Sequence, residues 1–344
     1  MPTVCPVRQN GNVTDIPLSV LDLASVGEGE SLADTLHGCV EVARAAERCG
    51  YSRVWYAEHH NSATIASSAT AVLIAHVAAH TSTIRLGSGG IMLPNHSPLV
   101  IAEQFGTLAT LHPGRIDLGL GRAPGTDQVT VKAMRRDPMA AENFPQDVME
   151  LQAFLGEVSR VPGVVAMPGQ GTNVPVWILG SSLYGAQVAA LLGLPYAFAS
   201  HFAPQALHQA LRVYRERFTP SAVLDRPRVM VAMGVVADTD EESAQRQFER
   251  RRRGFVRLRL QRPGGGTLSD GEIDEFLRTP QASSINEIFT YSAVGTPESV
   301  AEKVRDFAAE TGADEVITSH HGSSTAAKVR SVELLASAFN LRAA

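Results

Sequence analysis

The sequence is poor in cysteine and has no long apolar run. Its 344 residues include only three cysteines, Cys5, Cys39 and Cys49. An odd and sparse set of cysteines does not form a disulfide framework and is typical of a reducing compartment. Residues 1–13 lack a basic stretch followed by an apolar one, so no signal peptide is predicted. No segment reaches the roughly 20 apolar residues of a membrane helix. We therefore expect a cytoplasmic protein without a membrane partner.

An excess of charge of one sign is also missing. The chain has 30 basic and 35 acidic residues and a formal net charge of -5. Nucleic acids and anionic membranes are therefore not expected as partners. The one basic run, Arg250–Arg253, follows Glu249 in a predicted helix. We interpret this run as a solvated helix face.

Short apolar runs alternate with segments of helical periodicity. Hydrophobic residues make up 44% of the chain, which suits one large α/β domain or two ordinary ones. Eight runs rich in β-branched residues have the length of buried parallel strands. They cover residues 16–24, 52–58, 83–93, 115–121, 174–180, 195–201, 228–237 and 314–320.

Capping signals mark the helices between these runs. Ser31, with Asp34 three residues on, predicts a helix start, and Gly50 predicts its end. Other helix starts are predicted at Ser97-Pro98, at Thr239 with Glu242 three residues on, and at Thr296-Pro297.

Eight strand–helix units predict a (β/α)8 TIM barrel formed by one domain over residues 1–344. Residues 258–293 contain a glycine triplet and little periodicity, so they are predicted to be a mobile insertion between the seventh and eighth strands. This insertion is either a lid over the barrel or a surface decoration. An open doubly wound sheet is the alternative architecture. The absence of G-x-G-x-x-G after the first strand disfavours that alternative.

Polar residues gather where the predicted strands end. Glu58, His59 and His60 close the second strand, and His201 closes the sixth. Asn95-His96 follow the third strand, and His320-His321 follow the eighth. Loops at the carboxyl ends of barrel strands converge on one mouth. Because adjacent side chains on a strand point in opposite directions, at most one histidine of each adjacent pair should face it.

Glycines interrupt two of these strands. Gly89-Gly90 lie inside an apolar run, and Gly119 and Gly121 end the next strand. Such glycines indicate a bulge, an unusual backbone conformation or the close approach of a flat ligand. Tight barrel packing is the other interpretation, and the residues alone do not separate the two.

Hydroxyl side chains occupy the junction after the fifth strand. Gly180 is followed by Ser181 and Ser182, and a helix is predicted from Leu183. The N-terminus of a helix attracts anions, so a phosphate could bind here with Arg122 as its counter-charge. A serine is equally the ordinary cap of a helix.

Four segments, taken in order, resemble the bacterial luciferase-like flavin-dependent monooxygenases. They are RVWYAEHHN (53–61), the run from LGSGG to GRAPG (86–125), VPVWILGSS (174–182) and AVGTPESVAEKV (293–304). The resemblance implies a barrel that binds reduced FMN delivered by a separate flavin reductase. It also implies that O2 adds to the flavin C4a position and that the resulting peroxide oxidises a small organic substrate. Members of this family are usually homodimers.

The resemblance also assigns roles to residues. His59 matches the catalytic histidine, with His60 as a second catalytic candidate. Gly89-Gly90 match a non-prolyl cis peptide against the flavin ring. The remaining residues implied to bind the cofactor are Arg122 and Ser181 at the phosphate, His201 lining the flavin pocket, and Glu58, Gly180 and Ser182 beside them. Two departures argue against light emission: Gly121 replaces a reactive cysteine of the light-emitting luciferases, and Gly180 replaces an acid.

Three alternatives remain open. Some relatives of this kind use a deazaflavin for hydride transfer without oxygen, and others bind flavin without known turnover. Rim histidines on a barrel could instead hold zinc in a hydrolase. The first strand, however, carries Asp22 and lacks the His-x-His of such enzymes, so no metal site is predicted.

Overall fold

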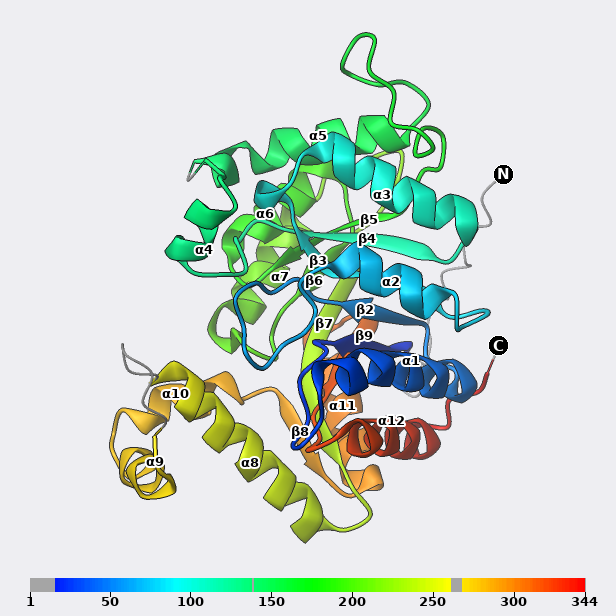
Figure 1. Ribbon diagram of the computed structural model, residues 1–344. Coiled ribbons are helices and arrows are strands. Elements are labelled where there is room, and N and C mark those ends of the chain that lie inside the picture. The colour runs from blue at the N-terminus through cyan, green and yellow to red at the C-terminus, as the bar shows by residue number, and fades with distance from the viewer. Residues whose placement is uncertain (1–15, 138, 261–267, 344) are drawn as a thin grey trace.

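A computed structural model describes residues 16–137, 139–260 and 268–343, and it is a closed barrel of parallel strands with helices outside (Figure 1). The barrel closes because β6 pairs with β7, and β1 pairs with both β2 and β9. The short strand β8 pairs only with β7 and extends the sheet outside the barrel. The strands are β1 (Leu18–Asp22), β2 (Arg53–Tyr56), β3 (Arg85–Met92), β4 (Ile116–Gly121), β5 (Val176–Gly180), β6 (Tyr196–Phe198), β7 (Val229–Ala237), β8 (Ser292–Gly295) and β9 (Glu315–His320).

Helices lie outside the barrel, most of them against its strands, and none of those described is long and apolar enough to cross a bilayer. They are α1 (Leu32–Cys49), α2 (Thr70–Ala78), α3 (Pro98–Leu111), α4 (Gln128–Ala133), α5 (Phe144–Leu155), α6 (Leu183–Leu192), α7 (Leu207–Glu216), α8 (Glu241–Arg259), α9 (Asp270–Leu277), α10 (Ala282–Ile288), α11 (Pro297–Thr311) and α12 (Thr325–Phe339). In the described residues, the 3-10 turns η2 (Leu93–Asn95), η3 (Ala140–Asn143) and η4 (Pro204–Ala206) contribute to the connections.

Most of the predicted helix boundaries are confirmed. Ser31 and Asp34 form a capping box at α1, and Gly50 ends this helix in the left-handed conformation. The start predicted at Thr239 is wrong by one residue. Asp240 is the N-cap of α8, because its carboxylate accepts a hydrogen bond from the backbone N–H of Ser243.

The predicted insertion, residues 258–293, contains more regular structure than its sequence suggests. Its described part forms α9 and α10 and reaches the start of β8, while residues 261–267 lie outside the described residues. Val256 of α8 packs with Ile273, Ile285 and Phe289 in a separate apolar cluster. That cluster anchors the segment to α8. Its mobility and its closure over the barrel stay predictions.

The barrel interior holds its own small apolar core. It is formed by Leu21, Trp55, Trp177, Ala197, Met230, Ala232 and Ile317. Trp55 and Trp177 meet edge to face with ring centroids 5.5 Å apart. Because side chains alternate along a strand, these residues define which positions of each strand point inward. The strand residues that alternate with them point outward and pack against the helices in the main core.

A buried ion network fills the amino-terminal end of the barrel. The guanidinium of Arg53 lies 2.6 Å from Asp117 of β4 and 2.8 Å from Glu315 of β9. Asp117 also pairs with Arg85 and accepts a hydrogen bond from the Trp55 indole at 3.3 Å. Burial alone would raise the pKa of Asp117, but Arg53 and Arg85 hold it below its usual value. This end is therefore closed by satisfied charges, and access to the interior must be from the other end.

We predict that Arg53→Met lowers the free energy of unfolding by about 3–5 kcal/mol, because it leaves two buried carboxylates without their shared cation. Arg48→Met is the matched control, since Arg48 pairs with Glu333 on the surface and should contribute at most about 1 kcal/mol. Urea denaturation of both variants measures the difference. Equal destabilisation of the two would contradict the role given to the network.

Candidate active site

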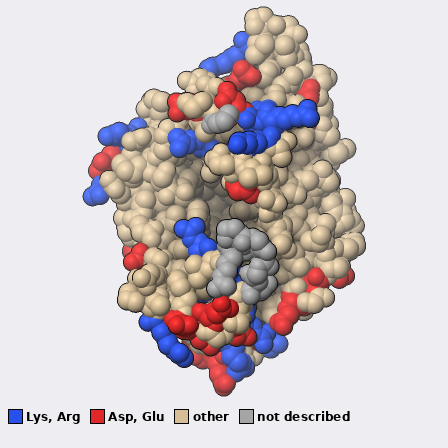
Figure 2. Space-filling model, turned by 60° about the vertical axis from the view of Figure 1, so that its left-hand side comes forward, with Lys and Arg blue, Asp and Glu red and all other residues tan. Residues whose placement is uncertain are grey.

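The carboxyl ends of the barrel strands form an open mouth. The segments that follow β2, β3 and β4 lie to the left of the strands in Figure 1. Figure 2 brings that side of the molecule forward and shows a hollow near the middle of this face. Histidines from several strand ends and one arginine from α8 surround the space.

His59 faces this space from the end of β2. It lies two positions beyond Ala57 and four beyond Trp55, so it continues the inward-facing set. Its backbone N–H donates to the Ser67 carbonyl at 3.0 Å, which fixes the loop. Its Nδ1 is buried and has no hydrogen-bond partner within the described chain. Burial lowers the pKa of His59, so the imidazole is neutral at neutral pH and Nδ1 is available to a ligand.

Glu58 and His60 form a separate cluster behind His59. The buried Glu58 carboxylate accepts hydrogen bonds from His60 Nε2 at 2.9 Å and from His96 Nε2 at 3.0 Å. It also accepts one from Asn95 Nδ2 and one from the Met92 backbone N–H, both at 3.1 Å. Glu58 therefore joins the end of β2 to the turn after β3. This position supports the mouth mechanically, while direct roles for Glu58 and His60 stay predictions.

His201 and His321 also face the mouth. His201 Nδ1 and His321 Nε2 are buried and without a hydrogen-bond partner in the part of the chain that is described. Burial lowers the pKa of His201 to about 3 and that of His321 well below its usual value, and nearby Arg251 acts in the same direction on both. His320 points the other way and bonds Ser331 Oγ of α12 at 2.8 Å. The prediction that only one histidine of this pair faces the mouth is confirmed.

The interpretation of Arg250–Arg253 as a solvated face is wrong for Arg251. Its guanidinium carbon lies 5.0 Å from the centre of the Phe289 ring. A Cβ built on Gly234 of β7 would come within 2.8 Å of Arg251 Nη1, so this nitrogen lies directly over the strand. The sequence did contain a pattern that indicates burial of Arg251. This residue follows Phe248 by three positions and precedes Phe255 by four, so it lies on the apolar face of α8.

The paired glycines shape the β3 side of the mouth. The peptide between Gly89 and Gly90 is cis, and the pairing of β3 with β4 shifts register between Ser88 and Ile91. The predicted irregularity of the backbone is thus confirmed. A Cβ at Gly119 would lie 2.2 Å from the Ser88 carbonyl oxygen, so tight packing explains that glycine. Gly89 faces inward, where a Cβ would lie 2.8 Å from the Leu21 side chain.

A cationic and hydrogen-bonding site lies where β5 meets α6. Ser182 is the N-cap of α6, yet its hydroxyl makes no capping hydrogen bond. The first N–H groups of a helix have no partner within it, so they are available to an anion. Arg122, after β4, stacks on the Tyr184 ring at 4.1 Å and places a cation at this helix start. Gly180 packs closely, since a Cβ there would lie 3.0 Å from Tyr196 Oη.

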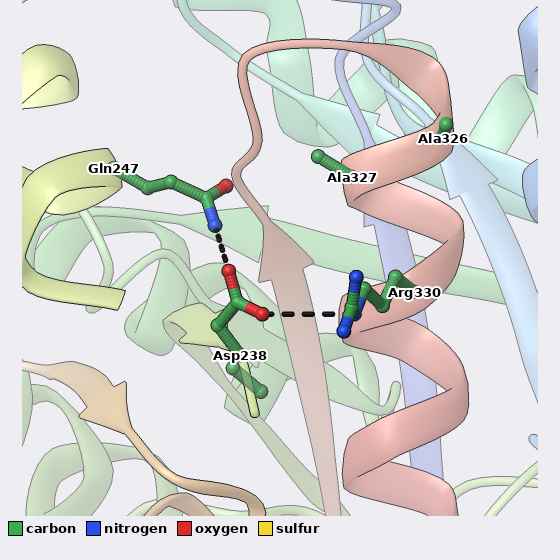
Figure 3. A pocket seen from close by; sticks show the side chains of 6 residues that line it. Asp238, Gln247, Ala326, Ala327 and Arg330 are labelled. Carbon is green, nitrogen blue, oxygen red and sulfur yellow. Dashed lines mark hydrogen bonds and ion pairs between the residues drawn. The ribbon is translucent and has the colours of Figure 1, made fainter. Parts of the chain in front are cut away.

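A separate cavity of about 220 Å³ lies outside the barrel between α8 and α12 (Figure 3). Asp238 accepts a hydrogen bond from Gln247 at 2.7 Å and lies 3.6 Å from Arg330. None of the mouth residues lines it. In the described ranges, no group of three or more His, Cys, Asp or Glu side chains is placed to hold a metal ion.

Comparison with known proteins gives concordant matches over nearly the whole chain. A sequence model of luciferase-like monooxygenases matches residues 16–315. A luciferase-like monooxygenase of Escherichia coli (strain K12) is 47% identical over 320 residues, covering 93% of this chain and 96% of that protein. The crystal structure of apo-MsnO8 matches with a TM-score of 0.83 and 34% identity, covering 95% of this chain and 99% of that one.

Two solved structures of low sequence identity share the fold. One is a type II Baeyer-Villiger monooxygenase from Pseudomonas putida in complex with FMN, with a TM-score of 0.67 and 17% identity over 93% of this chain and 96% of that one. The other is an F420-dependent secondary alcohol dehydrogenase with an F420–acetone adduct, with a TM-score of 0.67 and 14% identity over 94% of this chain and 99% of that one. A barrel of this shape therefore accommodates either cofactor.

We predict that Glu58→Gln destabilises the protein by about 1–3 kcal/mol at neutral pH, because it weakens several charged hydrogen bonds at once. Burial alone would raise the pKa of Glu58, but the bonds from His96, His60 and Asn95 hold it below the usual 4.5. A lowered folded-state pKa stabilises the fold above the unfolded value, and this contribution disappears as pH falls through the folded value.

The difference in unfolding free energy between wild type and Glu58→Gln should therefore reach its maximum above about pH 5.5 and decrease below about pH 4.5. Denaturant unfolding across this pH range measures it. Glu41→Gln, at an exposed position of α1, is the control and should show little difference at any pH. A gap for Glu58→Gln that grows on acidification would refute the assignment of a stabilising carboxylate.

Proposed function

The chain belongs to the luciferase-like monooxygenase family, and from this premise we propose that it oxidises a small organic substrate with reduced FMN and O2 at the mouth of the barrel. One observation carries the proposal: Gly89-Gly90 of β3, Arg122 after β4 and the start of α6 after β5 lie on consecutive strands of the barrel. We assign Gly89-Gly90 as the wall against the flavin ring, and Arg122 with the start of α6 as the anion site.

The residues around the mouth fit a flavin. Arg122, Ser181 and Ser182 would hold the phosphate through charge and the free N–H groups of α6. Gly89-Gly90 have no side chain to obstruct the flat ring, and the buried Nδ1 of His201 would be available to hold it. Gly180 keeps the backbone at the α6 start close to β6. Bound reduced FMN would supply the electrons with which O2 is activated.

His59 is the residue best placed to handle a proton. Its Nδ1 lacks a partner in the described ranges, and its lowered pKa keeps it neutral. A neutral imidazole can accept a proton and return it, which is the requirement for general acid–base work. Its position on a strand end, with the backbone held by Ser67, keeps the ring in place. Glu58 and His60 would position His59 from behind rather than touch the reacting atoms.

The sequence also supports three further proposals. As the resemblance implies, a separate flavin reductase would supply the reduced cofactor, and the protein would work as a homodimer. The third proposal, that it acts in the cytoplasm, is supported by the sparse cysteines rather than by the resemblance. Hydride transfer with the deazaflavin F420 is the second candidate activity, and the shared fold of the alcohol dehydrogenase favours keeping it. A flavin-binding protein without turnover is the non-enzymatic alternative.

Cofactor preference is the first test. We expect anaerobic titration to show that reduced FMN binds at least about tenfold more tightly than reduced F420. Mixing the FMN complex with O2 should then change the rate of flavin reoxidation relative to free reduced FMN. The reverse preference would replace an oxygenase by a hydride-transfer enzyme. FMN binding without any effect on the reaction with O2 would favour a storage protein.

Arg122→Ala and His59→Ala separate binding from chemistry and serve as controls for each other. Arg122→Ala should weaken FMN binding by about 1.5–3 kcal/mol, the value of a charged hydrogen bond. His59→Ala should keep FMN affinity within about threefold but change the rate of flavin reoxidation by O2 about tenfold or more, because the proton-handling group is gone. Calorimetry and stopped-flow absorbance measure the two quantities. Unchanged affinity in the first variant, or an unchanged rate in the second, would remove the corresponding role.

A further inference from the structure

The four consecutive arginines of α8 have different surroundings. Three of them pair with carboxylates, whereas Arg251 has none among the residues that the structure describes. The pairs are Arg250–Glu28, Arg252–Glu249, Arg253–Asp270 and Arg253–Asp274. The Nη1 of Arg251 is buried and unbonded. One cation of the run is thus half-buried and has no counter-charge among the described residues.

Arg251 points into the mouth of the barrel. Met230 and Ala232 of β7 belong to the interior core, so Gly234 is the next inward-facing position toward the carboxyl end. The missing side chain of Gly234 leaves the room that Arg251 Nη1 occupies. The hydroxyl of Ser292, another buried group without a partner among described residues, lies beside the same glycine.

The groups around Arg251 are basic as well. The electrostatic neighbours of the His201 ring are Arg251 and His59, and those of His321 are Arg251, His201, Lys328 and His320. The named neighbours of both rings are basic residues, and Glu58 acts on the nearby His59. Both rings keep an unbonded nitrogen toward this space. The pocket therefore presents several hydrogen-bonding groups around the cation of Arg251, and the Glu58 carboxylate near His59 is already held by its own hydrogen bonds.

A buried guanidinium without an anion is unfavourable, and an arginine cannot readily relieve this by losing its proton. Burial lowers the pKa of Arg251 to about 9, which still leaves it charged at neutral pH. The Phe289 ring offsets part of the cost through its negative face, but it cannot replace a carboxylate. A ligand that brings an anion into the pocket would supply the missing counter-charge of Arg251.

The cofactor phosphate is not that anion, because its proposed site lies elsewhere. Arg122 and the start of α6 follow β4 and β5, whereas Arg251 lies over β7. In the order of the closed barrel, β7 is four strands from β3 and so lies across from the Gly89-Gly90 wall. A flavin ring against that wall would leave Arg251 on the opposite side of the mouth.

We propose that Arg251 receives the carboxylate of the substrate, so that the substrate is an organic acid bound between β7 and the cofactor. The inference rests on the proposed function for its oxidation chemistry, but the anion site itself rests on Arg251, Gly234 and Ser292. The planar guanidinium matches the two oxygens of a carboxylate. Ser292 and the facing histidines supply further hydrogen bonds to the acid or to polar groups next to it.

Calorimetric titration of the full chain, with and without FMN, tests this directly. The probes are benzoate and hexanoate, each compared with its neutral primary amide. We expect the better carboxylate to bind at least about tenfold more tightly than its amide. Arg251→Gln should abolish this preference. Arg250→Gln is the matched control, because Arg250 is the exposed neighbour in the same run and should leave the preference unchanged.

Equal binding of each acid and its amide by the wild type, or a preference that survives in Arg251→Gln, would overturn the proposal. If Arg251→Gln does not fold, Arg251→Lys replaces it and should weaken carboxylate binding while keeping the preference for the acid, since the charge remains but the planar fork is lost. Failure of both cofactors to bind, together with Arg251-dependent carboxylate binding, would refute the proposed oxygenase and leave the anion site standing.

Discussion

Alternation of side chains along the strands of a closed barrel is the constraint on which the site depends. Once Trp55 and Ala232 occupy the interior core, the positions beyond them on the same face, His59 and Gly234, must open into the mouth. The same rule sends His320 outward to Ser331 and turns His321 inward. The functional groups are thus aligned by the packing of apolar residues that lie two or four positions earlier on the same strand.

The two ends of the barrel use polar groups in opposite ways. At the amino end, Arg53, Asp117 and Glu315 satisfy one another and close the interior. At the carboxyl end, His59 and Arg251 keep buried nitrogens without partners in the described chain. Buried polar groups normally find partners within the protein, so the unbonded set gathered at the mouth supports the ligand position proposed there. The stabilising and the reactive parts of the molecule are therefore separated along the barrel axis.

Much of the fold could be predicted from sequence because its signals are local. The eight barrel strands appear as continuous apolar runs, and the capping box of Ser31 depends on side chains within four residues of one another. The errors concern choices between neighbours that local patterns leave nearly equal. Asp240 rather than Thr239 caps α8, since its carboxylate reaches the Ser243 N–H. The ordered helices at 270–277 and 282–288 were missed because their apolar residues pack on α8 rather than on the barrel.

The sequence by itself determined the strand–helix alternation, the glycine pair in β3 and the identity of the residues at the strand ends, because each is a property of a short segment. Only the tertiary structure decided which of those residues share a space. Arg251 and Gly234 belong to different elements of the chain. The direction of the Arg251 side chain depends on how α8 crosses the end of β7 and on the contact with the Phe289 ring. The spacing from Phe248 and Phe255 places Arg251 on the apolar face of α8, but which strand it contacts depends on the geometry of both elements.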